Sequence, residues 1–138
     1  MIKYFTSFCS FLFVFSCYSQ NTVEFAKFLK VLGRVESNNN DFAVGDNGKS
    51  ISRYQIQRPA FEDAKQFNKL IKFNYESLTN QVNSQVIVVS YFMRYAPQEL
   101  KNSDFESLAR LWNSGPGWKN KKHLTNHYWN KIKKELNK

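Results

Sequence analysis

Both cysteines of this chain, Cys9 and Cys17, lie within its first twenty residues. This segment, Met1–Gln20, has a single charge at Lys3, followed by an apolar stretch that ends in small and polar residues. The stretch is shorter than the roughly 20 apolar residues of a membrane-spanning helix, and its order of features is typical of a secretory signal. We therefore expect an exported domain at residues 21–138. Because no disulfide can form in that domain, its fold has to depend on an apolar core.

The end of the signal segment leaves two forms of the exported protein open. The residues from Val14 to Cys17 resemble the processing site of a bacterial lipoprotein, in which Cys17 becomes a lipidated first residue. Without that step the mature chain is secreted or periplasmic and carries no lipid. We accordingly expect export, with a lipid anchor through Cys17 as one of the two outcomes.

After residue 20, apolar side chains recur three and four positions apart in several segments, which predicts amphipathic helices. A capping-box pattern at residues 103–106 and a proline at position 97 help to set their limits. The expected helices run from about Asn21 or Thr22 to Ser37, from Pro59 through Phe67, over about fifteen residues before Pro97, from Ser103 to Ser114, and along Leu124, Tyr128, Ile132 and Leu136.

One short segment favours strands instead of helix. Asp46-Asn47-Gly48 lies between two runs of extended character, and an Asn-Gly pair in this position is a strong signal for a β-hairpin. No linker is long enough to separate two domains in a chain of 138 residues. We therefore expect one α+β domain that is predominantly helical and contains a small hairpin.

Glu36 continues the apolar stripe of the first expected helix, because it follows Leu32 by four positions and Leu29 by seven. Apolar neighbours disfavour the ionised form of a carboxyl group, so we expect a raised pKa. A carboxylic acid that stays protonated near neutral pH can act as a general acid. Glu36 is therefore the first candidate catalytic residue. A solvent-facing position at a frayed helix end is the alternative.

A second carboxylate is available close by in the sequence. Asp46 follows Glu36 by ten residues, at the tip of the expected hairpin, so the two side chains could face each other across a groove. Glycoside cleavage uses such a pair, in which one acid protonates the leaving oxygen and the other carboxylate stabilises or attacks the cationic sugar. Asp41 is an alternative partner, and Asp-Asn-Gly is also ordinary turn chemistry.

Six short motifs follow one another along residues 32–136: Val35–Asn38, Ala43–Ser50, Tyr54–Ile56, Tyr91–Ala96, Ala109–Pro116 and Thr125–Lys131. Their residue types, order and spacing resemble those of the lysozyme-like superfamily, most closely the invertebrate-type lysozymes, their bacterial relatives and transglycosylase-like domains. The resemblance implies a lysozyme-like fold with a small β-hairpin beside a cleft. It also implies cleavage of the β-1,4 linkages of peptidoglycan, with chitin as an alternative glycan.

The resemblance implies a role for individual residues. Glu36 matches the catalytic acid, Asp46 the second carboxylate and Gln55 a glutamine that lines the cleft, while residues 113–116 match the turn that closes its far side. The substrate-binding residues expected in all are Ser50, Tyr54, Gln55, Asn113, Gly115, Pro116, Trp118 and Tyr128.

Aromatic side chains could supply flat faces for sugar rings, although most aromatics at helical spacing belong to the core. We expect Trp118 to be exposed beside Gly117, and Trp112 to be buried. The sequence departs from the invertebrate-type pattern in three respects. The domain lacks cysteine, Ser114 replaces a glycine, and Ser52-Arg53 replaces a Gly-Pro pair, which places a charge near the groove.

The last part of the chain, Lys119–Lys138, contains seven lysines and one acidic residue, in a protein with a net charge of +9. Such a segment favours attraction to anionic cell-wall polymers. We do not expect nucleic-acid binding, because no matching motif accompanies the charge. His123 and His127 are four residues apart but lack a third ligand, so we expect no metal and no cofactor. We also expect a monomer.

Two rivals to a hydrolase remain open. A lytic transglycosylase would use Glu36 alone and close the sugar on itself, which leaves an anhydro end. A glycan-binding module that keeps the groove without turnover belongs to a different class of protein.

Overall fold

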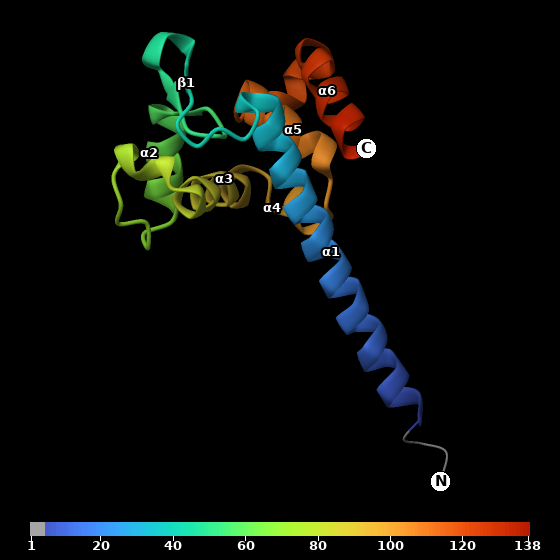
Figure 1. Cartoon of the computed structure of the whole chain (residues 1–138). Coiled ribbons are helices and arrows are strands. Elements are labelled where there is room, and N and C mark those ends of the chain that lie inside the picture. The colour runs from blue at the N-terminus through green and yellow to red at the C-terminus, as the bar shows by residue number, and fades with distance from the viewer. Residues whose placement is uncertain (1–4) are drawn as a thin grey trace.

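Helices make up most of this protein, and one small sheet lies at the edge of the helical part (Figure 1). The computed structural model describes the backbone of residues 5–138 and the side chains of residues 21–138. Within these limits the α-helices are α1 (Phe5–Ser37), α2 (Arg58–Phe67), α3 (Gln81–Tyr95), α4 (Pro97–Lys101), α5 (Phe105–Ser114) and α6 (Asn126–Leu136). The 3₁₀ helices between them are η1 (Asp46–Gly48), η2 (Tyr75–Thr79) and η3 (Trp118–Thr125). The expected α+β class with a helical majority is confirmed.

Helix α1 is longer than the sequence analysis predicted. It begins at Phe5 and not near Asn21, because neither glycine nor proline interrupts the sequence before Gly33. Figure 1 shows the first half of α1 projecting beyond the other elements. The expected secretory signal falls on residues 1–4 and on the side chains of residues 5–20, Cys9 and Cys17 included, which lie outside the described residues. Among the residues that are described, no helix combines the length and the apolar character needed to cross a membrane.

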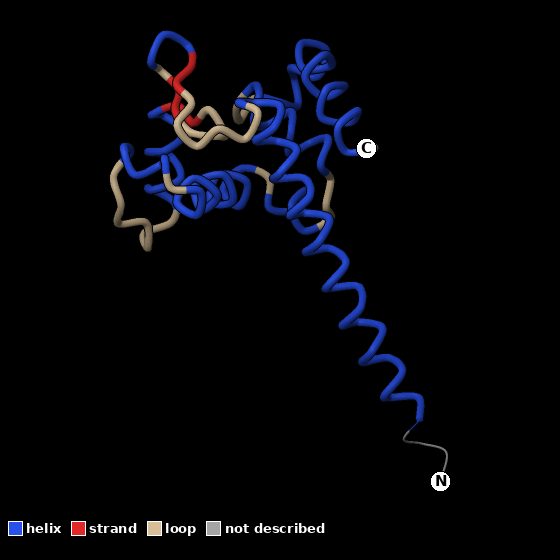
Figure 2. Tube along the Cα trace, viewed as in Figure 1, coloured by secondary structure: helices blue, strands red, loops and turns tan. Residues whose placement is uncertain are grey.

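The three strands, β1 (Val44–Gly45), β2 (Ser50–Ile51) and β3 (Ile56–Gln57), form an antiparallel sheet in the order β1-β2-β3 (Figure 2). Gly45 pairs with Ser50 across the predicted hairpin, which is confirmed. The third strand was not predicted. A Cβ atom at Gly45 would lie 1.9 Å from Gln55 Oε1, so only glycine fits where the hairpin meets that side chain.

The core forms where α1, α3 and α5 meet. Phe28 of α1 is fully buried and stacks on Phe105 of α5, with ring centroids 4.8 Å apart and planes 9° apart. Phe92 of α3 also packs against Phe28, with ring centroids 6.3 Å apart. Tyr54 and Ile56 are also fully buried and join the sheet to the same core. Aromatic and aliphatic packing thus holds the described domain together without a disulfide.

A buried arginine joins α5 to the last part of the chain. Arg110 is 5% exposed, and its guanidinium donates to Glu106 at 2.7 Å and to the carbonyl oxygen of Lys122 at 2.7 Å. It also donates to Thr125 Oγ1 at 2.8 Å and to Asn126 Oδ1 at 3.0 Å. Since these acceptors satisfy the buried charge, Arg110 fixes η3 and the start of α6 against α5.

The bounds of the later helices agree with the prediction more closely than the exposure of their residues does. Helix α3 has 15 residues and ends before Pro97, which opens the short, unpredicted helix α4. Leu124, expected on the apolar stripe of the last helix, is 67% exposed and lies in η3. Helix α6 therefore starts later than predicted, at Asn126.

Candidate active site

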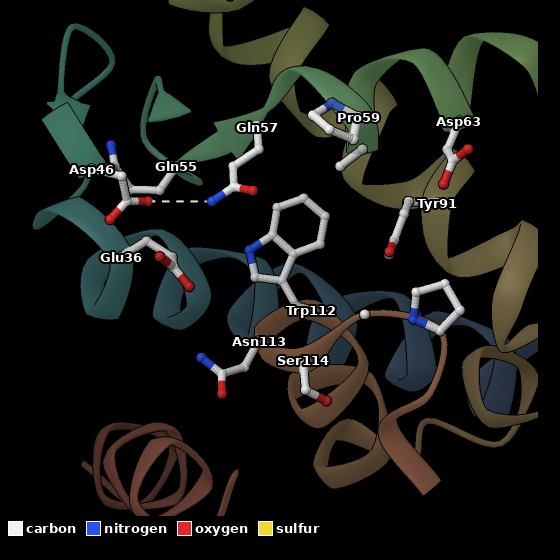
Figure 3. A pocket seen from close by; sticks show the side chains of 13 residues that line it. Glu36, Asp46, Gln55, Gln57, Pro59, Asp63, Tyr91, Trp112, Asn113 and Ser114 are labelled. Carbon is white, nitrogen blue, oxygen red and sulfur yellow. Dashed lines mark hydrogen bonds between the residues drawn. The ribbon is translucent and has the colours of Figure 1, made fainter. Parts of the chain in front are cut away.

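A cleft of about 470 Å³ opens between the end of α1, the sheet, α2, α3 and the end of α5. Figure 3 shows Glu36 and Asp46 together at one end, Asp63 and Tyr91 at the other, and Trp112 between them. The lining residues are Glu36, Asp46, Gln55, Gln57, Pro59, Ala60, Asp63, Tyr91, Trp112, Asn113, Ser114, Gly115 and Pro116. The cleft therefore brings together both expected catalytic carboxylates and four of the expected substrate-binding residues.

Glu36 lies in the last turn of α1, where the apolar stripe reaches the cleft. Burial of the carboxyl group is the main cause that raises the pKa of Glu36 from 4.5 to about 7. The Tyr128 hydroxyl donates a hydrogen bond of 2.5 Å to Glu36 Oε1, which opposes part of this rise, and the negative charge of Asp46 adds to it. The raised pKa expected from the sequence is confirmed.

Tyr128, which was expected to bind substrate, contacts Glu36. It belongs to α6 and is half-buried behind Glu36, so it does not line the cleft. Burial and the neighbouring Glu36 raise the pKa of Tyr128 well above 10, which keeps the phenol protonated. Tyr128 is therefore a hydrogen-bond donor that positions the carboxyl group of Glu36.

The Tyr128→Phe variant is expected to raise the pKa of Glu36 above about 7. The hydrogen bond stabilises the carboxylate more than the neutral acid, so its loss favours the protonated form. Carboxyl NMR titration of Glu36 measures this shift directly. Tyr95→Phe removes a phenol that donates to Asp63 at the other end of the cleft, and it should leave the pKa of Glu36 unchanged. A pKa that falls or stays constant in Tyr128→Phe would contradict this role.

Asp46 is the second carboxylate of the cleft, and the alternative Asp41 is engaged elsewhere. Asp46 is exposed in η1 and has a positive φ of 50°. Its Oδ2 lies 3.1 Å from Ser50 Oγ and 3.4 Å from Gln57 Nε2. Asp41 instead accepts two hydrogen bonds from Arg53, at 2.6 and 3.1 Å, and does not line the cleft. Arg53, whose charge was expected near the groove, pairs with Asp41 and does not line the cleft.

Ser50, which was expected to bind substrate, is buried behind the cleft and does not line it. It is fully buried in β2, and its Oγ lies 2.9 Å from Gln55 Oε1 as well as 3.1 Å from Asp46 Oδ2. Its one hydroxyl hydrogen can be donated to either acceptor. Gln55 Nε2 also donates to the carbonyl oxygen of Ser52 at 3.0 Å. Ser50 thereby connects the orientation of Gln55 to that of Asp46.

Trp112 and Tyr91 are the aromatic residues that line the cleft, whereas Trp118 was expected to be the exposed aromatic residue. Trp112 is half-buried and lies edge-to-face on Tyr91 at 5.7 Å. Its Nε1 donates to the carbonyl oxygen of Tyr54 at 3.2 Å. Trp118 is only 4% exposed, because η3 folds back onto α5 and buries the indole. Tyr54, also expected to bind substrate, is fully buried and does not line the cleft.

The far side of the cleft is formed as expected. Helix α5 ends at Ser114, where Gly115 adopts a φ of 79° that favours glycine, and Pro116 follows. Asn113, Gly115 and Pro116 all line the cleft.

The sequence analysis assigned no role to the residues at the end of the cleft that lies away from Glu36 and Asp46. Asp63 of α2 accepts a hydrogen bond of 2.8 Å from the Tyr95 hydroxyl, and Arg94 Nη1 lies 3.8 Å from its carboxylate. Tyr91 is 6% exposed, and burial raises its pKa to about 12. Within the described residues its hydroxyl has no hydrogen-bond partner. Tyr91 lay within a motif that carried the resemblance, whereas Asp63 and Gln57 carried no signal of their own.

The charges of the cleft are opposite to those of the chain as a whole. Three carboxyl groups line it, from Glu36, Asp46 and Asp63, and its lining contains no lysine or arginine. The described residues bring no three His, Cys, Asp or Glu side chains together as a metal site requires. Searches for relatives found no protein-family model and no curated protein that matches this chain. The chemistry of the cleft is therefore the basis for assigning a function.

Proposed function

We propose that this protein is an exported glycoside hydrolase that cleaves the β-1,4 linkages of peptidoglycan in the manner of a lysozyme. The observation that supports this most strongly is the pair of carboxyl groups at one end of an open cleft. Glu36 has a pKa of about 7 and can carry a proton near neutral pH, while Asp46 is exposed to solvent. Glycoside cleavage requires such a pair, in which one carboxyl group holds a proton and the other is a carboxylate at the same end of the cleft.

In the proposed reaction Glu36 donates its proton to the glycosidic oxygen as the bond from that oxygen to the anomeric carbon breaks. The electron pair of the bond stays on the leaving oxygen, and Asp46 stabilises the positive charge that develops on the sugar. Glu36 is then a carboxylate and removes a proton from a water molecule that attacks the anomeric carbon. The acid is regenerated, and the product carries a hydrated reducing end.

The rest of the cleft suits a neutral sugar chain. Trp112 offers an aromatic face, and Gln55 and Asn113 offer amide groups that both donate and accept hydrogen bonds. The lysines of Lys119–Lys138 lie outside this lining, so attraction to anionic wall polymers is proposed as a property of the outer surface.

The exposed position of Asp46 on a turn favours one second candidate, a lytic transglycosylase. In that reaction Glu36 protonates the leaving oxygen and then accepts a proton from a hydroxyl group of the same sugar. This hydroxyl attacks the anomeric carbon and leaves an anhydro end, so no second carboxylate is needed.

Digestion of purified cell-wall sacculi, followed by mass spectrometry of the soluble fragments, tests the proposal. Hydrated reducing ends are expected for the hydrolase, and anhydro ends would identify the transglycosylase. Binding to sacculi without release of fragments would contradict both and indicate a glycan-binding module.

Asp46→Asn is expected to lower the rate of fragment release about 100-fold or more, because the amide cannot stabilise the cationic sugar with a full negative charge. The same digestion measures the rate. Asp41→Asn is the matched control, since Asp41 is held by Arg53 outside the cleft, and it should retain activity. Full activity of Asp46→Asn would rule out the mechanism with two carboxylates.

A further inference from the structure

A second pocket of about 390 Å³ lies on the other side of the chain segment that follows β2. Two consecutive residues belong to different cavities: Gln55 lines the cleft, and Tyr54 lines the second pocket. The Trp112 indole, a cleft residue, donates to the carbonyl oxygen of Tyr54. The pocket is lined by Ala26 and Lys30 of α1, Asn39, Arg53, Tyr54, and Gln81 and Gln85 of α3.

The Tyr54 hydroxyl has a hydrogen with no acceptor in the described part of the chain. Its oxygen accepts a hydrogen bond of 3.3 Å from Gln85 Nε2, and the Arg53 side chain also hydrogen-bonds to it. Burial raises the pKa of Tyr54, so the phenol keeps its hydrogen and acts as a donor. Because Tyr54 is fully buried, an unsatisfied donor there is costly unless a ligand accepts from it.

The other groups around the pocket also donate hydrogen bonds or carry positive charge. Lys30 forms no ion pair with any described residue. Arg53 binds Asp41 through Nε and Nη2 and also hydrogen-bonds to the Tyr54 hydroxyl, so it contributes its positive charge to the pocket. Asn39 also lines the pocket, and its Oδ1 is buried without a hydrogen-bond partner among the described residues.

The charge of this pocket is the reverse of that of the cleft. No carboxyl group belongs to its lining, whereas three line the cleft, and Asp41 contacts Arg53 from outside the pocket. A cation would find no counter-charge here, and a ligand without acceptor atoms would leave the Tyr54 hydrogen unsatisfied. An oxyanion provides both the charge and the acceptors.

We propose that this pocket is a binding site for a small oxyanion, a carboxylate or a phosphate group, which Lys30 and the Tyr54 hydroxyl bind directly. The side-chain amides of Gln81 and Gln85 complete the set of donors. The site does not depend on the hydrolase function, because it lies outside the cleft and needs no turnover. A terminal carboxylate of a wall peptide and a phosphate of a wall polymer share this chemistry.

Titrations of the full protein with inorganic phosphate and with N-acetylalanine, at constant ionic strength, test the site. NMR shifts of the backbone amides at Gln81 and Gln85 are the readout. Saturable binding of at least one anion is expected, and the anion that binds more tightly identifies the source. Shifts that grow linearly without saturation for both anions would overturn the proposal.

Three variants separate this site from general attraction to a basic protein. Lys30→Gln is expected to weaken binding on the order of 10-fold, because a charge-assisted contact is lost. Lys133→Gln removes the same charge from an exposed position on α6 and should bind as the unmodified protein does. Equal weakening in both variants would show that only net charge matters.

Gln85→Glu is the third variant, and it places a carboxylate of the protein itself in the proposed anion site. The new carboxylate accepts the hydrogen of Tyr54 and repels an anion, so binding should be lost while the fold is kept. Binding that persists in Gln85→Glu would contradict the proposed position of the anion. Failure of sacculus digestion would leave all of these results unaffected, because they measure binding alone.

Discussion

Glu36→Gln is expected to reduce the release of soluble fragments from sacculi by about 10³-fold or more, with the fold unchanged. The amide has nearly the same shape as the acid, and its carbonyl oxygen can still accept the hydrogen bond from Tyr128. It has no acidic proton to give to the glycosidic oxygen, so both proposed reactions lose their first step. Fragment release by the purified variant, measured against the unmodified protein, gives the loss.

The matched control is Glu62→Gln, which makes the same chemical change at an exposed position of α2. This variant should retain full activity, since Glu62 does not line the cleft. Activity of Glu36→Gln within a few-fold of the unmodified protein would remove Glu36 from the chemistry. Thermal unfolding of both variants establishes that any loss of activity is not a loss of fold.

Glu36 is also expected to make the protein less stable as the pH rises. Its pKa is about 7 in the folded state against an ordinary value of 4.5, so the folded state binds the proton more tightly. The resulting stabilisation is fully present below pH 4.5 and is lost as the pH rises to about 7. A difference of this size corresponds to about 3 kcal/mol in the free energy of unfolding.

Urea unfolding of the unmodified protein and of Glu36→Gln, at pH 4, 6 and 8, measures this contribution. The uncharged amide cannot titrate, so Glu36→Gln should be more stable than the unmodified protein by about 3 kcal/mol at pH 8. At pH 4 the two should be nearly equal. Glu62→Gln is again the control and should follow the unmodified protein throughout. A difference between Glu36→Gln and the unmodified protein that is the same at pH 4 and pH 8 would contradict the raised pKa.

Local signals predicted much of the secondary structure. Pro97 and Gly115 mark real helix boundaries, because proline disrupts the preceding turn and a positive φ favours glycine. The third strand could not be predicted in this way. It contains two residues, and the Tyr75 hydroxyl binds the carbonyl oxygen of Ile56 at 2.6 Å, a contact between segments far apart in the sequence.

The residues of the candidate site were likewise predictable where a local sequence pattern marks them, and not where tertiary packing brings them to the cleft. Glu36 was predicted from a helical stripe and Asp46 from a turn, both of which are local patterns. The exposure of Trp118 was not predictable from its neighbour Gly117, since it depends on how η3 folds onto α5. Asp63 comes to the cleft through the packing of α2 on α3, which no short motif encodes.

Helix α1 ends at the proposed acid, so the partial negative charge that aligned peptide dipoles create at a helix C-terminus falls close to Glu36. This partial charge disfavours the ionised carboxylate in the same direction as burial does. It acts only in the final turn, because such fields fade within one turn of the helix end. The proton affinity of the acid is therefore independent of where α1 starts, and cleavage after residue 20 would leave it unchanged.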